Sequence, residues 1–354
     1  MSPLNFELAA GWRLVEPRAD APELLVEAGG CLLHWKSDFT QLHAFGEVGP
    51  VDCPAAYDPL SRTAYRYVCE SRLQRRDFSR LLAYDLDGGG VRTVLDLPLN
   101  QWVLWLLEWV EGRGPEEGRL FGLVAADRPA DDRVVIEHRL FTMAPSEPRP
   151  RLRPLCRDAY RPLAFSRRRR ELVFAGAEGV YILGLKGERL AALPLSEGPG
   201  GDGASFDPSG GPRVALGGEG IHLWDFGGGR CERLVRLGRH PVWSPDGRGI
   251  YYGESSGDLH YYDLDAGRSV RLVGLRDNRL PEFWHARPVC MDGSGRFLAL
   301  PLTGKRLKGV ARASDPSGVR ERVYEHRHTL CVLDTERREL WHRDGAFVNR
   351  ARWT

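Results

Sequence analysis

Residues 242–273 read VWSPDGRGIYYGESSGDLHYYDLDAGRSVRLV, in which four short apolar segments are separated by three polar turns. The first turn, at 244–247, contains the proline that pre-sets φ and the Asp-Gly pair that a tight turn favours. The third turn has Asp263 and Gly267 where a hairpin needs polar residues or residues with positive φ. This stretch therefore predicts four consecutive antiparallel strands.

The same order of segments recurs along the chain. Residues 205–210 (SFDPSG) are followed by 221–228 (IHLWDFGG), and residues 56–61 (AYDPLS) by 82–89 (LAYDLDGG). Weaker copies begin near residues 107, 164 and 289. Phe206 and Trp243 lie 37 residues apart, and Phe165 and Phe206 lie 41 apart, close to the ~40–45 residues of a four-stranded propeller blade. Six such units fit between about residues 51 and 342.

The two ends of the chain supply a seventh unit. Residues 346–354 stop at an aromatic residue, as an innermost strand would, whereas residues 23–45 supply outer strands that lack an inner one. A blade built from both ends closes the ring and removes free sheet edges. We therefore predict an all-β fold, a seven-bladed β-propeller of four-stranded antiparallel blades, closed by N- and C-terminal strands that share one blade.

The prediction places the whole chain, residues 1–354, in a single domain. Residues 12–15 could form an extra edge strand. The approximate blades are 10–48 with 346–354, 51–98, 102–155, 160–197, 203–236, 239–275 and 286–342.

The Ser-Pro-Asp-Gly turn at 244–247 and the Leu-x-x-Tyr-Asp-Leu-Asp pattern at 259–265 resemble the TolB-like branch of the WD-repeat-like β-propellers. The resemblance is good over residues 199–275 and fair over 51–98. The sequence departs from TolB itself because residues 1–17 contain no export signal. A periplasmic role is therefore not expected.

Charge and cysteine content restrict the compartment and the partners. Lys plus Arg is 50 and Asp plus Glu is 48, a net charge of +2, which gives no general attraction to nucleic acid or anionic lipid. No run of eighteen apolar residues predicts a membrane span. The 7 cysteines form no Cys-x-x-Cys pair, so we expect reduced thiols in the cytoplasm. The preference for arginine over lysine is typical of GC-rich coding and favours a bacterial source.

Function is expected where the repeats are broken. The connection between second and third strands is short at 254–258 but long at 70–80, at 126–133 and, longest, at 303–328. Alternating strands place these three inserts on one face, on the second, third and seventh units, which form one arc of the ring with the composite first blade. The cationic residues predicted to bind a partner there are Arg72, Arg75, Arg76, Arg80, Lys305, Arg306, Lys308, Arg320, Arg322 and Arg327.

Three interpretations of these basic inserts stay open. They could be solvated loops that a rigid scaffold tolerates. They could bind an acidic protein surface or peptide, since arginine makes forked contacts with carboxylates. They could bind phosphate or nucleic acid, although Phe78 and Tyr324 are the only interleaved aromatic residues.

The same face receives the connections between blades, which surround the mouth of the central channel. A funnel of aromatic and cationic groups there could hold a peptide or small acid, or the same residues could simply pack between blades. The predicted channel-mouth residues are Trp102, Tyr160, His240, Trp284, His285 and Arg287.

The sequence contains none of the common catalytic, phosphate-binding or zinc-binding motifs. Residues 85–90 resemble part of a calcium loop but lack its later Glu, so they are interpreted as a turn. We predict no catalytic residue, no metal ligand and no cofactor. The leading hypothesis is a non-catalytic scaffold that binds another protein or an acidic peptide through the insert-bearing face. The alternatives are a channel-centred, metal-dependent hydrolase or lactonase that gathers ligands from several blades, and phosphate or nucleic-acid recognition by the Arg-rich inserts.

Overall fold

The computed structural model covers the whole chain and describes most of it. The described residues are 6–28, 31–45, 55–72, 75–97, 102–110, 118–130, 133–147, 149, 151–154, 159–176, 178–194, 202–254, 258–275, 283–286, 290–292, 294–312, 320–345 and 348–354. Within them the secondary structure is strand and turn, and no helix is long and apolar enough to cross a membrane.

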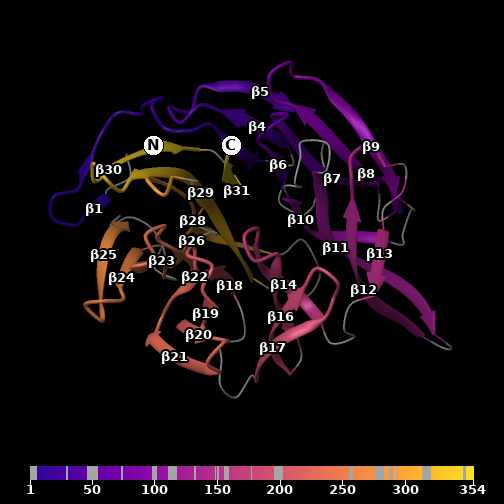
Figure 1. Cartoon of the computed structure of the whole chain (residues 1–354). Coiled ribbons are helices and arrows are strands. Elements are labelled where there is room, and N and C mark those ends of the chain that lie inside the picture. The colour runs from indigo at the N-terminus through magenta and orange to yellow at the C-terminus, as the bar shows by residue number, and fades with distance from the viewer. Residues whose placement is uncertain are drawn as a thin grey trace.

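The described strands form seven sheets arranged in a ring, which confirms the predicted seven-bladed β-propeller (Figure 1). In every blade the first strand lies at the channel and the later strands follow outward. The strands run in sequence order except in blade one, whose innermost strand is the last of the chain. Blades one to three consist of β31 (Val348–Trp353), β3 (Leu24–Ala28), β4 (Cys31–Trp35) and β5 (Gln41–Phe45); β6 (Ala56–Asp58), β7 (Thr63–Arg72), β8 (Arg75–Asp85) and β9 (Val91–Leu97); and β10 (Trp102–Val110), β11 (Arg119–Ala130), β12 (Arg133–Met143) and β13 (Arg151–Pro154).

The remaining four blades follow the same order. Blades four to six consist of β14 (Ala159–Ser166), β15 (Glu171–Gly176), β16 (Gly179–Gly184) and β17 (Arg189–Pro194); β18 (Gly203–Phe206), β19 (Arg213–Gly218), β20 (Gly220–Asp225) and β21 (Arg230–Val235); and β22 (Arg239–Trp243), β23 (Gly249–Gly253), β24 (Leu259–Asp263) and β25 (Arg268–Leu275). Blade seven has β26 (Phe283–Ala286) and β27 (Cys290–Met291) innermost, then β28 (Phe297–Arg312), β29 (Arg320–Asp334) and β30 (Glu339–Asp344).

The ends of the chain share blade one, as the sequence predicts. β31 pairs antiparallel with β3, with Trp353 opposite Leu24 and Ala351 opposite Val26. Leu24 and Val26 are fully buried, and the Trp353 indole donates to the Cys290 carbonyl of blade seven at 3.1 Å. The last strand therefore joins the head of the chain to the blade that precedes it.

The first twenty residues reinforce two other blades before the chain enters blade one. β1 (Phe6–Leu8) pairs with β25 on the edge of blade six. β2 (Arg13–Leu14) pairs in parallel with β30 on the edge of blade seven. The sequence suggested an extra edge strand at residues 12–15. This segment does contain a strand, β2, which belongs to blade seven. We call residues 6–22 the N-terminal strap.

Aspartate residues explain why the third turn of the repeat recurs. In four blades the residue that ends the third strand accepts two backbone N–H groups with one carboxylate oxygen, from residues two and three positions later. These residues are Asp85, Asp225, Asp263 and Asp334, with acceptor distances of 2.9–3.1 Å. Such bonds fix a tight turn locally, so the Asp-x-Asp pattern marks a turn, as interpreted from the sequence.

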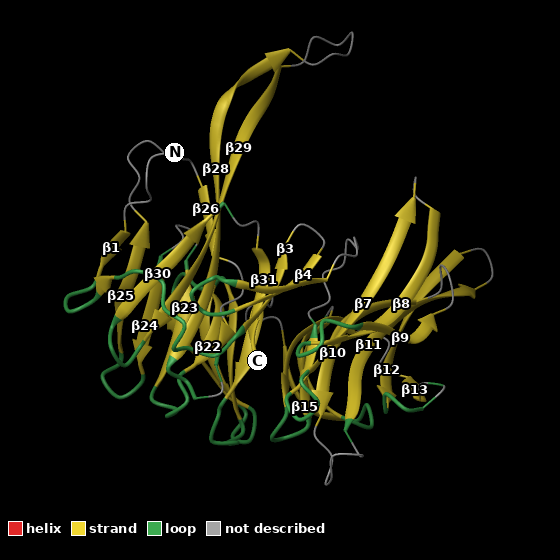
Figure 2. Cartoon of the chain, turned by 90° about the horizontal axis from the view of Figure 1, so that it is seen from above, coloured by secondary structure: helices red, strands yellow, loops and turns green. Residues whose placement is uncertain are grey.

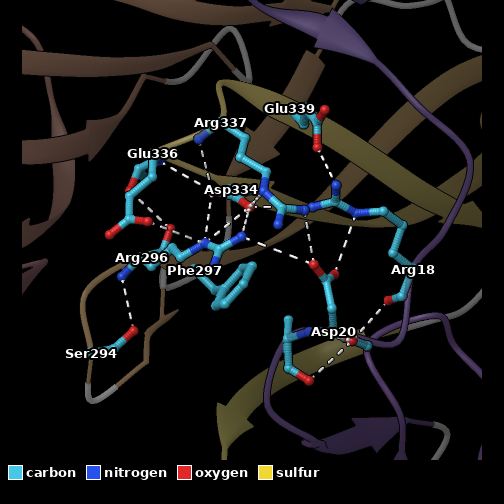
Figure 3. Close-up of polar contacts among 12 residues, drawn as sticks. Arg18, Asp20, Ser294, Arg296, Phe297, Asp334, Glu336, Arg337 and Glu339 are labelled. Carbon is cyan, nitrogen blue, oxygen red and sulfur yellow. Dashed lines mark hydrogen bonds and ion pairs between the residues drawn. The ribbon is translucent and has the colours of Figure 1, made fainter.

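One of these aspartates also anchors the N-terminal strap (Figure 3). The Asp334 side chain is fully buried and accepts from Arg296 Nη2 at 2.5 Å and Arg18 Nη2 at 3.2 Å. Arg18 also pairs with Glu339, and Asp20 accepts from Arg337 at 3.0 Å. Burial alone would raise the pKa of Asp334, but the bonds from Arg296 and the charge of Arg18 hold that pKa below its ordinary value.

We expect Asp334→Asn to lower the free energy of unfolding at pH 7 by about 3 kcal/mol, because it removes the buried charge of this network. A depressed pKa stabilises the fold above the unfolded value of about 3.9 and loses that contribution as pH falls through the folded value. The difference between variant and wild type should therefore begin to shrink as pH falls below about 4 and continue to shrink toward the folded value. Asp263→Asn, in the matching turn of blade six, is the control and should cost about 1 kcal/mol. Denaturant titrations from pH 7 to pH 3 test this, and equal costs for the two variants would contradict it.

Removing residues 346–354 should abolish cooperative unfolding, because β3 would become a bare inner edge beside blade seven. Removing residues 1–8 takes away β1 from the edge of blade six, together with the packing of Phe6 on His342 of blade seven, and should lower the melting temperature without changing cooperativity. Calorimetry and size-exclusion chromatography of the two truncated chains compare these outcomes. A monomeric, cooperatively melting chain without 346–354 would contradict the prediction.

Candidate functional site

The three inserts are extended β-hairpins, where the sequence led us to expect loops. In each insert the two strands stay paired as far as the structure describes them, with no third described strand beside them. The last pairs are Arg72 with Arg75, Ala130 with Arg133, and Arg312 with Arg320. About half of their backbone N–H and C=O groups are thus satisfied across the hairpin, and the others point outward along its two edges. We call β7–β8, β11–β12 and β28–β29 the short, middle and long ribbons.

The long ribbon stands far above the ring. β28 has 16 residues, whereas the second strands of blades four and five have 6 each. Ten additional residues at ~3.3 Å each correspond to roughly 30 Å of added reach. Figure 2 shows this ribbon projecting clear of the disc. All second-to-third hairpins leave the same face, and that of blade one is short, since Ala28 is already paired with Cys31. The long and short ribbons therefore flank blade one.

Register shows which side of the long ribbon faces blade one. At its root, Leu330 and Val332 of β29 pack with Leu24 and Val26 of blade one, whereas the alternate residues Cys331 and Leu333 pack with blade six. Because side chains alternate along a strand and opposed residues share a face, this assignment extends up the ribbon. The positions on the blade-one face include Lys305, Arg312, Arg320, Arg322, Leu307, Val310, Tyr324 and His326.

The opposite face of the long ribbon has a balanced charge. Its positions include Arg306 opposite Glu325, and Glu321 opposite Ala311, with Arg327 opposite Gly304. Lys308 is the extra residue of a bulge between Leu307 and Gly309. Two of the residues predicted to bind a partner, Arg306 and Arg327, thus lie on the face turned from blade one. The blade-one face carries four cations and no carboxylate among the described residues.

The short ribbon has the same polarity. Ala64 and Leu82 pack with blade one at its root, while Tyr65 and Leu81 pack with blade three. Continued up the ladder, this alternation puts three predicted residues on the blade-one face and Arg76, opposite Ser71, on the other. The three are Arg72, Arg75 and Arg80. Arg80 also forms an ion pair of 3.1 Å with Asp96 in its own blade. We call the blade-one faces of the long and short ribbons the basic sector.

The predicted channel-mouth residues lie at the starts of innermost strands. Trp102 opens β10, Tyr160 is the second residue of β14, and Trp284 and His285 lie in β26. The backbone thus places them around one rim, while Arg287 lies outside the described residues.

His240, the second residue of β22, has an unusual backbone conformation. It adopts φ of 51°, in the left-handed region that favours glycine, within an irregularity of the β22–β23 ladder. Its ring is half-buried against Gly203, where an added Cβ would lie 3.2 Å from His240 Nδ1. The strained backbone is therefore held by close packing between blades five and six.

The far end of the channel contains an ion pair that the sequence did not reveal. Arg352 Nη2 donates to Glu108 Oε2 at 2.6 Å, and Arg352 Nη1 donates to the Ala55 carbonyl at 2.8 Å. Arg167 lies 3.6 Å from the same Glu108 oxygen. Burial alone would lower the pKa of Arg352, but Glu108 raises it above its ordinary value. The ion pair links blade one to blade three, and the bond to Ala55, just before β6, links blade one to blade two. These contacts hold the three blades together in the ring.

A cavity of about 330 Å³ opens between the strap and the turns of blades one and two, on the face opposite the ribbons. Its lining includes Glu23, Lys36 and Arg62. Glu23 accepts from Arg62 at 2.7 Å and pairs with the buried His34 at 2.8 Å. Its carboxylate is thus already neutralised. Among the described residues, no group of three or more His, Cys, Asp or Glu side chains could hold a metal ion.

Burial lowers the pKa of His34, although Glu23 opposes the shift. A lowered histidine pKa means that the folded state resists protonation, so stability should fall as pH drops below the unfolded value of about 6.5. We expect the free energy of unfolding to decrease from pH 7.5 to pH 5.5, and His34→Gln to reduce that slope. Part of the slope should persist, because burial also lowers the pKa of His222 and His260. An unchanged slope in His34→Gln, compared with His342→Gln as control, would contradict this.

No family model and no curated protein matches the sequence. The structure, in contrast, matches 838 solved chains, so the fold is too widespread to indicate a function. One of them is described as "Structure of Dos1 propeller", with a TM-score of 0.51 and 11% sequence identity, covering 79% of this chain and 73% of that one. At this identity the likeness shows the fold alone. The chain is a seven-bladed β-propeller.

Proposed function

We propose that this protein is a non-catalytic binding scaffold whose basic sector recognises an acidic surface or segment of another protein. The observation that carries the proposal is the register of the long ribbon, in which the described positions on the face turned toward blade one include four cations, Lys305, Arg312, Arg320 and Arg322, and no carboxylate. A chain with a net charge of only +2 therefore concentrates positive charge on one rim. A cytosolic site of action and a TolB-like ancestry belong to the same proposal, supported by the cysteine spacing and the Ser-Pro-Asp-Gly turn.

Physical considerations favour a protein partner over a small molecule. The long and short ribbons rise on the two blades that flank blade one in a closed ring, so their roots are held in place before binding, which limits the ordering cost. Arginine makes forked, charge-assisted bonds with carboxylates. Tall, separated ribbons present an extended surface, whereas a small-molecule site needs an enclosed concavity.

Reversing four cations of the basic sector should abolish partner capture while leaving the melting temperature within about 2 °C, because the four positions lie beyond the buried roots of the ribbons, where substitutions have small effects on stability. The test variant is Arg72→Glu, Arg75→Glu, Arg320→Glu and Arg322→Glu. The matched control has the same charge change at exposed arginines near the turns of the opposite face: Arg92→Glu, Arg230→Glu, Arg248→Glu and Arg268→Glu.

Affinity capture from the native host with quantitative mass spectrometry compares the two variants with wild type. The proposal requires a partner that wild type and control retain and the test variant loses. Equal retention by all three chains would overturn it. A partner fraction made up of nucleic acid, released steeply by salt, would favour the phosphate-binding alternative.

A further inference from the structure

The long ribbon has a free edge that no described strand covers. β30 pairs with β29 only from Thr329 to Asp334, and one more bond joins the Gly345 N–H to the His328 carbonyl at 2.9 Å. Beyond that point, residues 320–327 pair with β28 on one side alone in the described structure. This leaves a line of backbone donors and acceptors about 26 Å long, at ~3.3 Å per residue.

The two edges of the ribbon differ in regularity. β28 contains the bulge at Lys308 and is covered at its base by β26, which pairs up to Lys305. β29 has no extra residue between Arg320 and Asp334. Bulges and inward charges protect an edge from further pairing, whereas a regular edge accepts a strand. A two-stranded ribbon is also only marginally stable in water, and a third strand stabilises it.

We propose, resting on the function proposed above, that the edge of β29 at residues 320–327 binds an extended acidic segment as an added β-strand. A second copy of this chain is disfavoured as the occupant, because the blade-one face of each ribbon carries Lys305, Arg312, Arg320 and Arg322 and two such faces would repel. An acidic strand has the complementary charge.

The alternation of charge along β29 sets the pattern that the segment needs. An added strand places every second residue on the blade-one face, beside Arg320, Arg322 and the positions of Tyr324 and His326. Its other residues lie beside Glu321, Val323, Glu325 and Arg327. Opposite charges on neighbouring strands attract and like charges repel. The edge therefore selects a segment with Asp or Glu at every second position and neutral residues between them.

Synthetic peptides test this pattern directly on the full-length protein. One ten-residue peptide alternates Asp or Glu with Val or Thr, and an isomer of identical composition has all its acids in one block. Fluorescence anisotropy should give a dissociation constant about tenfold or more lower for the alternating peptide. Equal affinity for both isomers would overturn the proposal.

Backbone methylation distinguishes strand addition from simple charge attraction. Alternate N–H groups of an added strand point to the same side, so N-methylation of one alternate set should abolish binding and methylation of the other set should be tolerated. If neither set matters, the peptide docks through its side chains alone and strand addition is wrong.

A pair of matched variants tests the face. Arg320→Glu with Arg322→Glu should weaken the alternating peptide about tenfold or more, whereas Arg306→Glu with Arg327→Glu, the same charge change on the other face, should leave affinity within about twofold. Equal losses would show that only net charge matters and would overturn the proposal.

Two results separate this proposal from the broader function. If the peptides bind without regard to pattern and the basic-sector variant still loses its cellular partner, strand addition is wrong and the scaffold function stands. If duplex DNA binds to wild type with a steep salt dependence and the peptides do not, both proposals are wrong.

Discussion

The pairing of β31 with β3 is the contact on which the rest of the molecule depends. It converts a row of sheets into a ring, because the last strand of the chain becomes the first strand of the blade that begins near its head. Without it blade one would lack its innermost strand, and blades seven and two would not be fixed on either side of it. The position of the ribbons relative to one another follows from this closure.

The two faces of the disc are built differently. On the turn face, aspartates fix hairpins locally, and the strap network around Asp334 and Glu339 ties the head of the chain to blade seven. The channel end on that side is bridged by Arg352 and Glu108. Polar groups on this face are thus committed to the fold. The ribbon face adds length and charge beyond the packed blades, so a molecule that binds there leaves the contacts of the opposite face undisturbed.

Much of the architecture could be predicted from the sequence, because a propeller repeats its turn chemistry. Asp-Gly and Asp-x-Asp turns recur with a spacing close to one blade, and the incomplete units at the two ends complement each other. The three inserts were also located correctly on blades two, three and seven. Their regular pairing was not foreseen, since residues 303–312 lack the apolar alternation that marks a half-buried strand.

Long-range partners explain the other omissions. Glu108 and Arg352 lie 244 residues apart, and nothing in either local sequence indicates the other. The division of the basic residues between two faces likewise depends on strand register. The sequence indicates that register only at the ribbon roots, where apolar side chains pack against blade one or blade six. Arg306 and Arg320 look equivalent in the sequence and differ only once pairing is known.

The single extra residue at Lys308 bears on how such ribbons can change during evolution. Side chains alternate with a period of two, so a ribbon that grows by two residues in each strand gains height while every side chain above the insertion keeps its face. An odd residue in one strand would shift the pairing and turn its later side chains over. Here the bulge absorbs that residue, so β29 keeps its alternation to Arg320. Height and polarity can therefore vary independently, which lets relatives of this scaffold adjust their reach while retaining the chemistry they present.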